Sequence, residues 1–245
     1  MKLRVLGSGT AAGQTGRNCS GYLVDDHILF DCGPGIWRVL SDSVEGVRRI
    51  DKIFLSHFHV DHVSDLIPIL WTRYVLEIGQ TLPLSIYGPI GVKTWFNQLT
   101  LVHKDWIREL RVSVHELSGK RVTVDSYQVE TLPTFHTRNS ICYKLTDPEN
   151  KSIFYTGDSA WNDGLVSLAK FCDLAVVEAS TPTMNPAADH LSPQSAGAIA
   201  HRSGAKMLLL THLYPEALEE DPLATAAKEY SGEIAIAHDG LTIEL

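Results

Sequence analysis

Residues 53–66, IFLSHFHVDHVSDL, carry the clearest signal of the fold in this sequence. An apolar run typical of a buried strand leads directly into three histidines and an aspartate, all within positions 57–62. A lone histidine is usually an ordinary core or surface ring, but a cluster this dense is rare by chance. Three imidazoles crowd unfavourably when protonated, whereas a divalent cation uses their neutral ring nitrogens as ligands. The stretch therefore predicts a metal site at the end of a strand.

Four later apolar runs also end on or near a side chain that can bind metal. LPTFH ends on His136, IFYTGD on Asp158 and MLLLTH on His212, and LAVVEAS comes shortly before His190. In α/β sheets, ligands bind outside the carboxyl ends of the strands, because the loops there converge on a rigid scaffold. We therefore expect the chemistry of this protein at its strand ends.

The spacing within HFHVDH divides its side chains between two ions. His57 and His59 are two positions apart, so in extended chain both side chains point the same way and reach one ion. Asp61 and His62 follow one step further on, near the start of a helix expected from Ser64, and face a second ion.

Later strands must complete both coordination shells. His136 suits the first ion and His212 the second, while the two oxygens of Asp158 can bridge them. Imidazole and carboxylate without thiolate favour Zn²⁺, with Mn²⁺, Fe²⁺ or Co²⁺ as alternatives to it. Two such ions about 3.5–4 Å apart lower the pKa of a bridging water and clamp the oxygens of a phosphoryl or carbonyl group under attack.

Composition and charge narrow the class of protein. With 245 residues and 44% hydrophobic composition, residues 1–245 suffice for one α/β domain. No run of eighteen apolar residues occurs, so we expect a cytoplasmic protein without a membrane span. The net charge of -8 and the scattered basic residues weigh against tight nucleic-acid binding by this chain alone. The four cysteines form no CxxC pair and are expected to be buried thiols.

The pattern of apolar residues predicts strands punctuated by helices. Strands are expected at 2–7, 21–26, 27–33, 51–57, 84–88, 109–117, 126–136, 140–147, 151–158, 173–180, 206–213, 233–240 and 241–245. Helices are expected at 35–43, 64–78, 91–99, 161–170, 192–203 and 215–230. Ser192 is the expected N-cap of the fifth helix, with Pro193 in its first turn and Gly204 just past its end. DPEN, residues 147–150, reads as a hairpin turn. Two sheets covered by helices satisfy this pattern.

With these residues the sequence resembles the metallo-β-lactamase fold superfamily, whose hallmark is HxHxDH followed by a distant His, Asp and His. It is more closely similar to the ribonuclease Z-like phosphodiesterase branch. The matching blocks are LGSGTAAGQTGRNCSGYLV, ILFDCGPG, TGDS, VVEAS followed by HLS, THLYP and AHDGLTIEL, in that order along essentially the whole chain. The resemblance implies an α/β four-layer αββα sandwich, with two mixed sheets flanked by helices, that hydrolyses phosphodiesters with two zinc ions.

The resemblance also implies roles for individual residues. One zinc would be held by His57, His59 and His136, the other by Asp61, His62 and His212, with Asp158 between them. His190 would be the general acid that protonates the leaving oxygen, oriented by Glu178, and Asp61 would accept the proton of the attacking water. Relatives of this kind are commonly homodimers, so a homodimer is also implied.

One departure from ribonuclease Z concerns the substrate. That enzyme grips tRNA with a long arm between the histidine that matches His136 and the bridging aspartate. Here only 21 residues separate His136 from Asp158, and two strands and a turn occupy them. We therefore expect a small, cyclic or short phosphodiester as substrate.

Several alternatives remain open beside this expectation. One is an RNA 3′-processing endonuclease of the ribonuclease Z type, and another is a metal-dependent hydrolase of thioesters, lactones or β-lactams. Redox chemistry at iron is disfavoured, because diiron relatives carry glutamate where this chain has His59. A binding role without turnover is disfavoured, because all seven ligands and the acid are present.

The remaining motifs are expected to support the site. Asp31 should hold a ligand histidine through its far nitrogen, and Asp239 with Gly240 should shape the floor. The glycine-rich GSGTAAG, residues 7–13, is expected to be a tight turn beneath the site rather than a phosphate loop, because no GK[ST] follows. Five histidines match no ligand block and are expected at the surface or in structural roles: His27, His103, His115, His201 and His238.

Overall fold

Two mixed β-sheets form the centre of the molecule in the computed structural model, which describes residues 1–42, 44–76, 78–184 and 187–245. The first sheet has the order β14-β1-β2-β3-β4-β5-β6. Its strands are β1 (Lys2–Gly7), β2 (Gly21–Val24), β3 (Ile28–Phe30), β4 (Lys52–Phe54), β5 (Leu84–Gly88), β6 (Val112–Glu116) and β14 (Thr242–Glu244). Strands β3 to β6 are parallel, whereas β14, β1, β2 and β3 pair antiparallel.

The second sheet has the order β13-β12-β11-β10-β9-β8-β7. Its strands are β7 (Arg121–Val124), β8 (Tyr127–Pro133), β9 (Ile141–Thr146), β10 (Ser152–Tyr155), β11 (Leu174–Glu178), β12 (Met207–Thr211) and β13 (Glu233–Ile236). Strands β10 to β13 are parallel, and β7 to β10 form antiparallel hairpins. Because both sheets place several parallel strands side by side, the carboxyl ends of those strands meet at a common edge.

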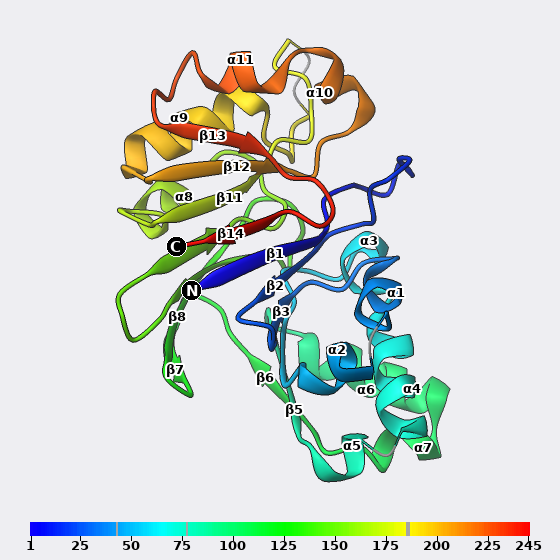
Figure 1. Ribbon diagram of the computed structural model, residues 1–245. Helices are drawn as coiled ribbons and strands as arrows, with labels where there is room; N and C mark the ends of the chain where they lie inside the picture. Colours follow the sequence, from blue (N-terminus) through cyan, green and yellow to red (C-terminus); the bar gives the residue numbers. More distant parts are fainter. Residues whose placement is uncertain (43, 77, 185–186) are drawn as a thin grey trace.

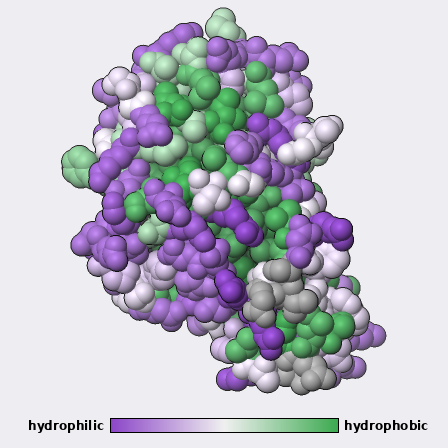
Figure 2. Space-filling view, viewed as in Figure 1, coloured by the Kyte–Doolittle hydropathy of each residue, from purple (hydrophilic) through white to green (hydrophobic). Residues whose placement is uncertain are grey.

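Helices cover the outer face of each sheet, which gives the expected four layers (Figure 1). On the first sheet lie α1 (Ile36–Leu40), α2 (Val44–Arg49), α3 (Val60–Val63), α4 (Leu66–Val75), α5 (Ile78–Thr81), α6 (Val92–His103) and α7 (Asp105–Arg108). On the second sheet lie α8 (Asp163–Leu168), α9 (Pro193–Ser203), α10 (Pro215–Glu219) and α11 (Pro222–Ala226). The same view in space-filling form shows hydrophobic residues mainly near its middle and top, with hydrophilic residues over most of the rest (Figure 2).

The core has three parts because side chains alternate between the faces of each strand. Along β12, Leu209 points into the layer between the two sheets, where Tyr143 and Tyr155 also pack. Its neighbours Leu208 and Leu210 point outward and pack beneath the helices of the second sheet. Successive side chains point to opposite faces, and both faces of such a strand are buried. Both sets of side chains are therefore apolar, so the buried strands appear in the sequence as continuous apolar runs.

Local signals in the sequence place several boundaries correctly. The Ser192 hydroxyl accepts a hydrogen bond from the Ser195 amide, and Gly204 ends α9 in the left-handed conformation with φ 69°. The predicted DPEN turn connects β9 to β10, with the Asp147 carboxylate accepting from the amides of Glu149 and Lys151.

Other predicted elements need correction. The single helix predicted at 215–230 is two helices, because Asp221 adopts φ 52° and caps α11, which Pro222 then begins. The predicted helices 35–43 and 64–78 include residues 43 and 77, which lie outside the described residues; their described parts form α1 and α4. Strand β7 was not predicted, and α3 begins earlier than the helix expected from Ser64.

Among the described residues, none of the helices has both the length and the apolar character that a membrane crossing requires.

Candidate metal centre

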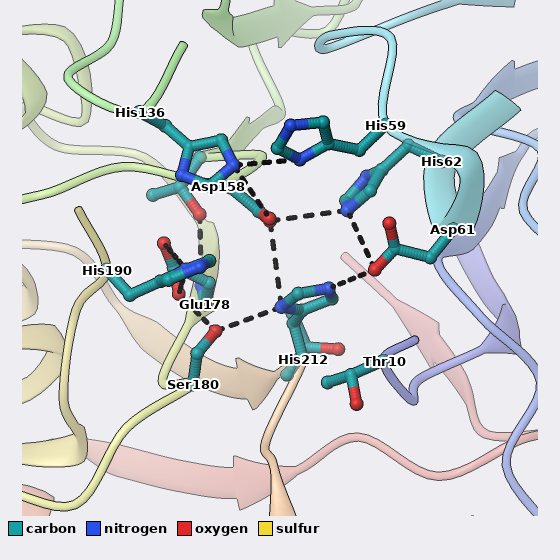
Figure 3. Close-up of polar contacts among 12 residues, drawn as sticks. Thr10, His59, Asp61, His62, His136, Asp158, Glu178, Ser180, His190 and His212 are labelled. Carbon is teal, nitrogen blue, oxygen red and sulfur yellow. Dashed lines mark hydrogen bonds and ion pairs between the residues drawn. The ribbon is translucent and has the colours of Figure 1, made fainter. Parts of the chain in front are cut away.

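Strand ends position the side chains of the candidate site. His57 follows β4, His136 follows β8, Asp158 follows β10 and His212 comes directly after β12. Glu178 is the last residue of β11. Segments from both sheets therefore reach one place, where their side chains face one another (Figure 3).

Two groups of potential metal ligands lie side by side at this edge. His57, His59, His136 and Asp158 offer ligand atoms within 4.8 Å of one another, and so do Asp61, His62 and His212. The two groups coincide with the predicted division between two ions. Asp61 and His62 lie within the short helix α3, with His59 at its N-terminal boundary, rather than in a loop before a helix.

Asp158 lies between the two groups. Its Oδ1 is 3.4 Å from His62 Nε2 and 3.6 Å from His212 Nδ1, while its Oδ2 is 3.8 Å from His57 Nε2 and 3.7 Å from His136 Nε2. Each carboxylate oxygen thus faces a different group, as a bridging ligand requires. In Figure 3 it occupies the centre of the cluster.

The buried donor atoms of the cluster fit a bound cation. His57 Nε2, His62 Nε2 and Asp158 Oδ1 are buried and have no hydrogen-bond partner within the part of the chain that the structure describes. A buried polar atom without a partner is costly, and a divalent metal accepts lone pairs from all three atoms. Imidazole and carboxylate donors without thiolate suit zinc or a similar first-row ion.

The electrostatics of the cluster also favour a positive ion. Burial, reinforced by the charge of His62, holds the pKa of His57 well below its usual value, so this ring is neutral. Burial alone would raise the pKa of Asp158, but the charges of His212 and His62 hold it well below the usual range. Burial opposes a charged His62, yet the Asp158 and Asp31 carboxylates raise its pKa well above the usual value. These carboxylates therefore stabilise positive charge at this point.

Asp31 orients His62 as expected. Its Oδ2 is 2.8 Å from His62 Nδ1, which leaves Nε2 directed into the cluster. The buried carboxylate also accepts hydrogen bonds from the Ser56 amide and hydroxyl, at 2.7 Å each, and from the Tyr155 hydroxyl at 2.6 Å. Four donors hold one acid rigidly, and Ser56 in turn contacts His57 Nδ1 at 3.0 Å.

Glu178 connects His190 to the cluster of candidate metal ligands. His190 Nδ1 lies 3.0 Å from Glu178 Oε2, and the Ser159 amide donates to Oε1 at 2.6 Å. The Ser180 hydroxyl donates to Oε2 and lies 2.9 Å from His212 Nδ1. Because the Ser180 hydroxyl donates its hydrogen bond to Glu178, its oxygen accepts a hydrogen bond from His212 Nδ1–H. This leaves the Nε2 lone pair of His212 free.

The glycine-rich turn near the N-terminus contacts the site, as predicted. The Ala11 amide donates to Asp61 Oδ2 at 3.2 Å, and the His212 amide donates to the Ser8 carbonyl. Asp239 fastens this turn by accepting from the Ser8 amide and hydroxyl and from the Asn18 amide.

Sequence reasoning missed several polar groups that support the site. Ser56, Ser180 and the Ala11 amide were not singled out, although each contacts an expected site residue. A hydroxyl directly beside a ligand or acid at a strand end was the available signal for Ser56 and Ser180. The backbone amide has no sequence signature.

Comparison with known proteins defines the class to which the chain belongs. Residues 26–213 match the family described as the β-lactamase superfamily domain. This match spans most of the chain, so the protein belongs to the β-lactamase superfamily, and the predicted fold and resemblance are confirmed. Membership of this family supports the prediction that the protein is a metal-dependent hydrolase.

Individual relatives match over the full length. The probable metallo-hydrolase YhfI of Bacillus subtilis is 29% identical over 253 residues, covering 100% of both chains. Ribonuclease Z of Myxococcus xanthus is 28% identical over 305 residues, covering 100% of this chain and 98% of its own. The crystal structure of YhfI matches with a TM-score of 0.87 at 26% identity, covering 100% of this chain and 98% of YhfI. That of human tRNase Z, short form, matches with a TM-score of 0.80 at 25% identity, covering 100% and 99%.

Proposed function

We propose that this protein is a metal-dependent phosphodiesterase that hydrolyses a small, cyclic or short phosphodiester. The observation that carries the proposal is the pairing of His190 with Glu178 directly beside the histidine cluster. A phosphodiester expels an alkoxide, which needs a proton as the bond to phosphorus breaks. A positioned imidazolium at the edge of a metal site supplies that proton.

Seven side chains would hold two metal ions, for which zinc is the first choice. They are His57, His59 and His136 for one ion, Asp61, His62 and His212 for the other, and Asp158 between them. When bound, the ions would supply an activated water at neutral pH and neutralise charge on the phosphoryl oxygens.

His190 is charged at neutral pH in this arrangement. Burial alone would lower its pKa, but the hydrogen bond and the charge of Glu178 raise the pKa to about 9. Since Nδ1 is held by Glu178, Nε2–H is the group that can reach a substrate. Hydrolysis of a thioester has less need for this acid, because a thiolate is a better leaving group than an alkoxide.

Asp61 has the properties of a proton acceptor for the attacking water. Burial alone would raise its pKa, but the neighbouring His212 and His62 lower it, so the side chain is ionised. The Ala11 amide donates to its Oδ2, which also lies 3.3 Å from His212 Nε2, while Oδ1 has no hydrogen bond among the described residues.

The shortness of the segment between His136 and Asp158 supports the proposal that the substrate is small. Strands β9 and β10 and their tight turn take up most of this segment, and both strands pair within the second sheet. The alignment with ribonuclease Z extends over 305 residues although this chain has 245, so that enzyme has segments without a counterpart here.

Hydrolysis of an aryl phosphodiester with added zinc or manganese tests the proposal. The wild-type protein should turn over bis(4-nitrophenyl) phosphate, and His57→Ala should abolish turnover together with metal binding. His201→Ala, at an exposed position on α9, is the matched control and should behave as wild type. No turnover above the His57→Ala level would remove the proposal, and faster hydrolysis of a thioester or lactone would favour the carboxylic alternative. A precursor tRNA in the same screen would reveal ribonuclease Z activity.

A further inference from the structure

A pocket adjoins the histidine cluster at His190. It has a volume of about 480 Å³ and is lined by Thr181, Pro182, Ala187, His190, Tyr214 and Glu216, together with the Ser180 side of the cluster. His190 borders both spaces, because its ring also lies 4.6 Å from that of His136. The volume falls within the range of small-molecule sites.

The proposed chemistry identifies which part of a substrate enters this pocket. A general acid must lie within hydrogen-bonding distance of the oxygen that it protonates. If His190 protonates the leaving oxygen, the alcohol carrying that oxygen must extend past His190, away from the metal cluster. The pocket is the space available there.

The chemistry of the lining limits the kind of alcohol that fits. Pro182, Ala187 and the ring of Tyr214 supply apolar surface, and the Tyr214 ring meets the His190 ring edge-on at 6.4 Å between centroids. Glu216 is the charged lining residue besides His190, and no lysine or arginine is among the described residues that line the pocket.

The walls of the pocket are tied together by hydrogen bonds. The Thr181 amide donates to the Leu191 carbonyl at 3.2 Å, and the Thr183 amide donates to Glu220 at the end of α10. The Tyr214 amide donates to the Ser180 carbonyl, which fastens the start of α10 to the other wall. Tyr214 is half-buried, and its hydroxyl has no hydrogen-bond partner within the described ranges, so it can bind a polar group of a ligand.

We infer that this pocket binds the leaving alcohol of the substrate and selects an uncharged or cationic alcohol with an apolar body over an anionic one such as a phosphorylated or carboxylated alcohol. Tyr214 contacts the apolar body, and Glu216 repels a negative charge. The inference rests on the proposed phosphodiesterase function and names the substrate class for it. In the reaction, water adds to phosphorus and loses a proton to Asp61, the bond from phosphorus to the leaving oxygen breaks, and that oxygen takes the proton from His190.

Three methyl phosphodiesters that differ only in the charge of the leaving alcohol test the inference. Their alcohols are benzyl alcohol, 4-carboxybenzyl alcohol and 4-(aminomethyl)benzyl alcohol, which are similar in size and in alkoxide basicity. The metal-loaded protein should release the neutral and cationic alcohols with kcat/KM about fivefold above that for the anionic one, since an exposed charge contributes modestly. Chromatography of the products identifies the alcohol released.

Variants locate the selectivity in the pocket. Glu216→Gln should remove most of the difference between the cationic and anionic esters, and Glu216→Lys should reverse it. Tyr214→Leu should raise KM for the benzyl ester about fivefold more than it raises KM for dimethyl phosphate. Glu219→Gln, on the same helix and exposed outside the pocket, is the matched control and should leave every ratio unchanged.

The outcomes separate this inference from the proposed function. Equal or faster release of the anionic alcohol, or a Glu216→Lys variant with unchanged ratios, would overturn the pocket assignment while the phosphodiesterase stands. Failure to hydrolyse any ester, including bis(4-nitrophenyl) phosphate, would overturn both. Ligand-observed NMR on the free alcohols adds a readout without turnover, in which benzyl alcohol should bind and 4-carboxybenzyl alcohol should not.

Discussion

At the residue scale, the candidate site is held by carboxylates that each accept several hydrogen bonds. Asp31 holds His62 and Ser56, and Glu178 holds His190, Ser180 and the Ser159 amide. In each case the carboxylate contacts the Nδ1 atom of the histidine ring. This leaves the other nitrogen, the one facing the cluster or the pocket, for metal or substrate.

Replacing Glu178 by glutamine should move the pH dependence of hydrolysis. The raised pKa of His190, about 9, keeps the ring protonated through neutral pH, so activity that needs the acid is lost as pH rises through about 9. Without the carboxylate charge the pKa should fall toward about 6.5, and the loss should begin near that pH. The measurement is kcat against pH for an alkyl phosphodiester.

A nitrophenyl diester serves as the internal control for this prediction. Nitrophenolate leaves without a proton, so its hydrolysis should depend much less on the state of His190. An unchanged alkaline limb for the alkyl substrate in Glu178→Gln would contradict the role of His190 as acid.

Removing the Ser180 hydroxyl should weaken metal binding. Ser180→Ala deletes the acceptor of His212 Nδ1–H, so the ring is no longer held with its Nε2 lone pair toward the cluster. We expect a loss of about 10–100-fold in zinc affinity, measured by competition with a chromogenic chelator. Ser180→Thr should retain affinity, and Ser203→Ala removes a buried hydroxyl elsewhere as the matched control. Equal affinity in Ser180→Ala and wild type would contradict this role.

At the element scale, close backbone approach places the ligands. Gly33 follows β3, and a Cβ there would lie 2.0 Å from the Asp61 carbonyl oxygen. Gly157 adopts φ 56° between β10 and Asp158, and a Cβ there would lie 2.6 Å from the Ser56 side chain. Gly33 lets the loop after β3 approach the backbone of α3, and Gly157 lets loops from the two sheets meet at the cluster. Asp31 and His212 also have positive φ, at 54° and 53°, a conformation that costs free energy and recurs at functional sites.

Replacing Gly33 by alanine should displace α3 and with it Asp61 and His62. The clash is with backbone, which cannot rotate away, so we expect a loss of about 1–3 kcal/mol in the free energy of unfolding. Metal affinity should fall as well. Denaturant unfolding and a zinc titration measure the two effects.

Gly119→Ala is the control that separates the cost of backbone strain from the effect of displacing the metal ligands. Gly119 also adopts a left-handed conformation, with φ 58°, but has open space around it. This variant should lose stability while zinc affinity stays at the wild-type level. Unchanged zinc affinity in Gly33→Ala would show that the loop carrying Asp61 tolerates the extra methyl group.

At the scale of the whole molecule, the cluster joins the two sheets. His57 and α3 come from the first sheet, whereas His136, Asp158 and His212 come from the second. A cation bound by both groups would therefore crosslink the two halves of the sandwich. It would also satisfy the buried atoms that otherwise lack a partner among the described residues.

Metal binding should consequently stabilise the folded protein. An ion that binds only the native state at one hundred times its Kd adds about 2.7 kcal/mol to the free energy of unfolding. Differential scanning fluorimetry should show a higher Tm with zinc than with a chelator. Asp158→Asn should lose most of this increase, whereas the exposed-site variant His201→Ala should keep it. An equal Tm with zinc and with chelator for the wild type would contradict a metal site between the sheets.

Two expectations about the whole molecule stay predictions. A homodimer is testable by light scattering of the purified protein. The treatment of residues 1–245 as one domain is testable by a single cooperative unfolding transition.

The amino-acid sequence alone was sufficient to predict the fold class and the chemical groups of the site. Apolar runs mark buried strands because such strands are covered on both faces, and HFHVDH with its distant partners has a donor set specific to metal. Short capping signals such as Ser192 and Gly204 also act within a few residues, so they could be read correctly.

The contacts among these groups could be seen only in the folded molecule. The contacts of Ser180 with His212, of the Ala11 amide with Asp61, and of Gly33 with the α3 backbone join residues far apart in the chain or involve backbone atoms. The pocket beside His190 likewise arises where Thr181, Pro182 and Ala187 lie near the start of α10. Such contacts depend on how strands from two sheets are placed in space, and residue type and spacing along one chain do not specify that placement.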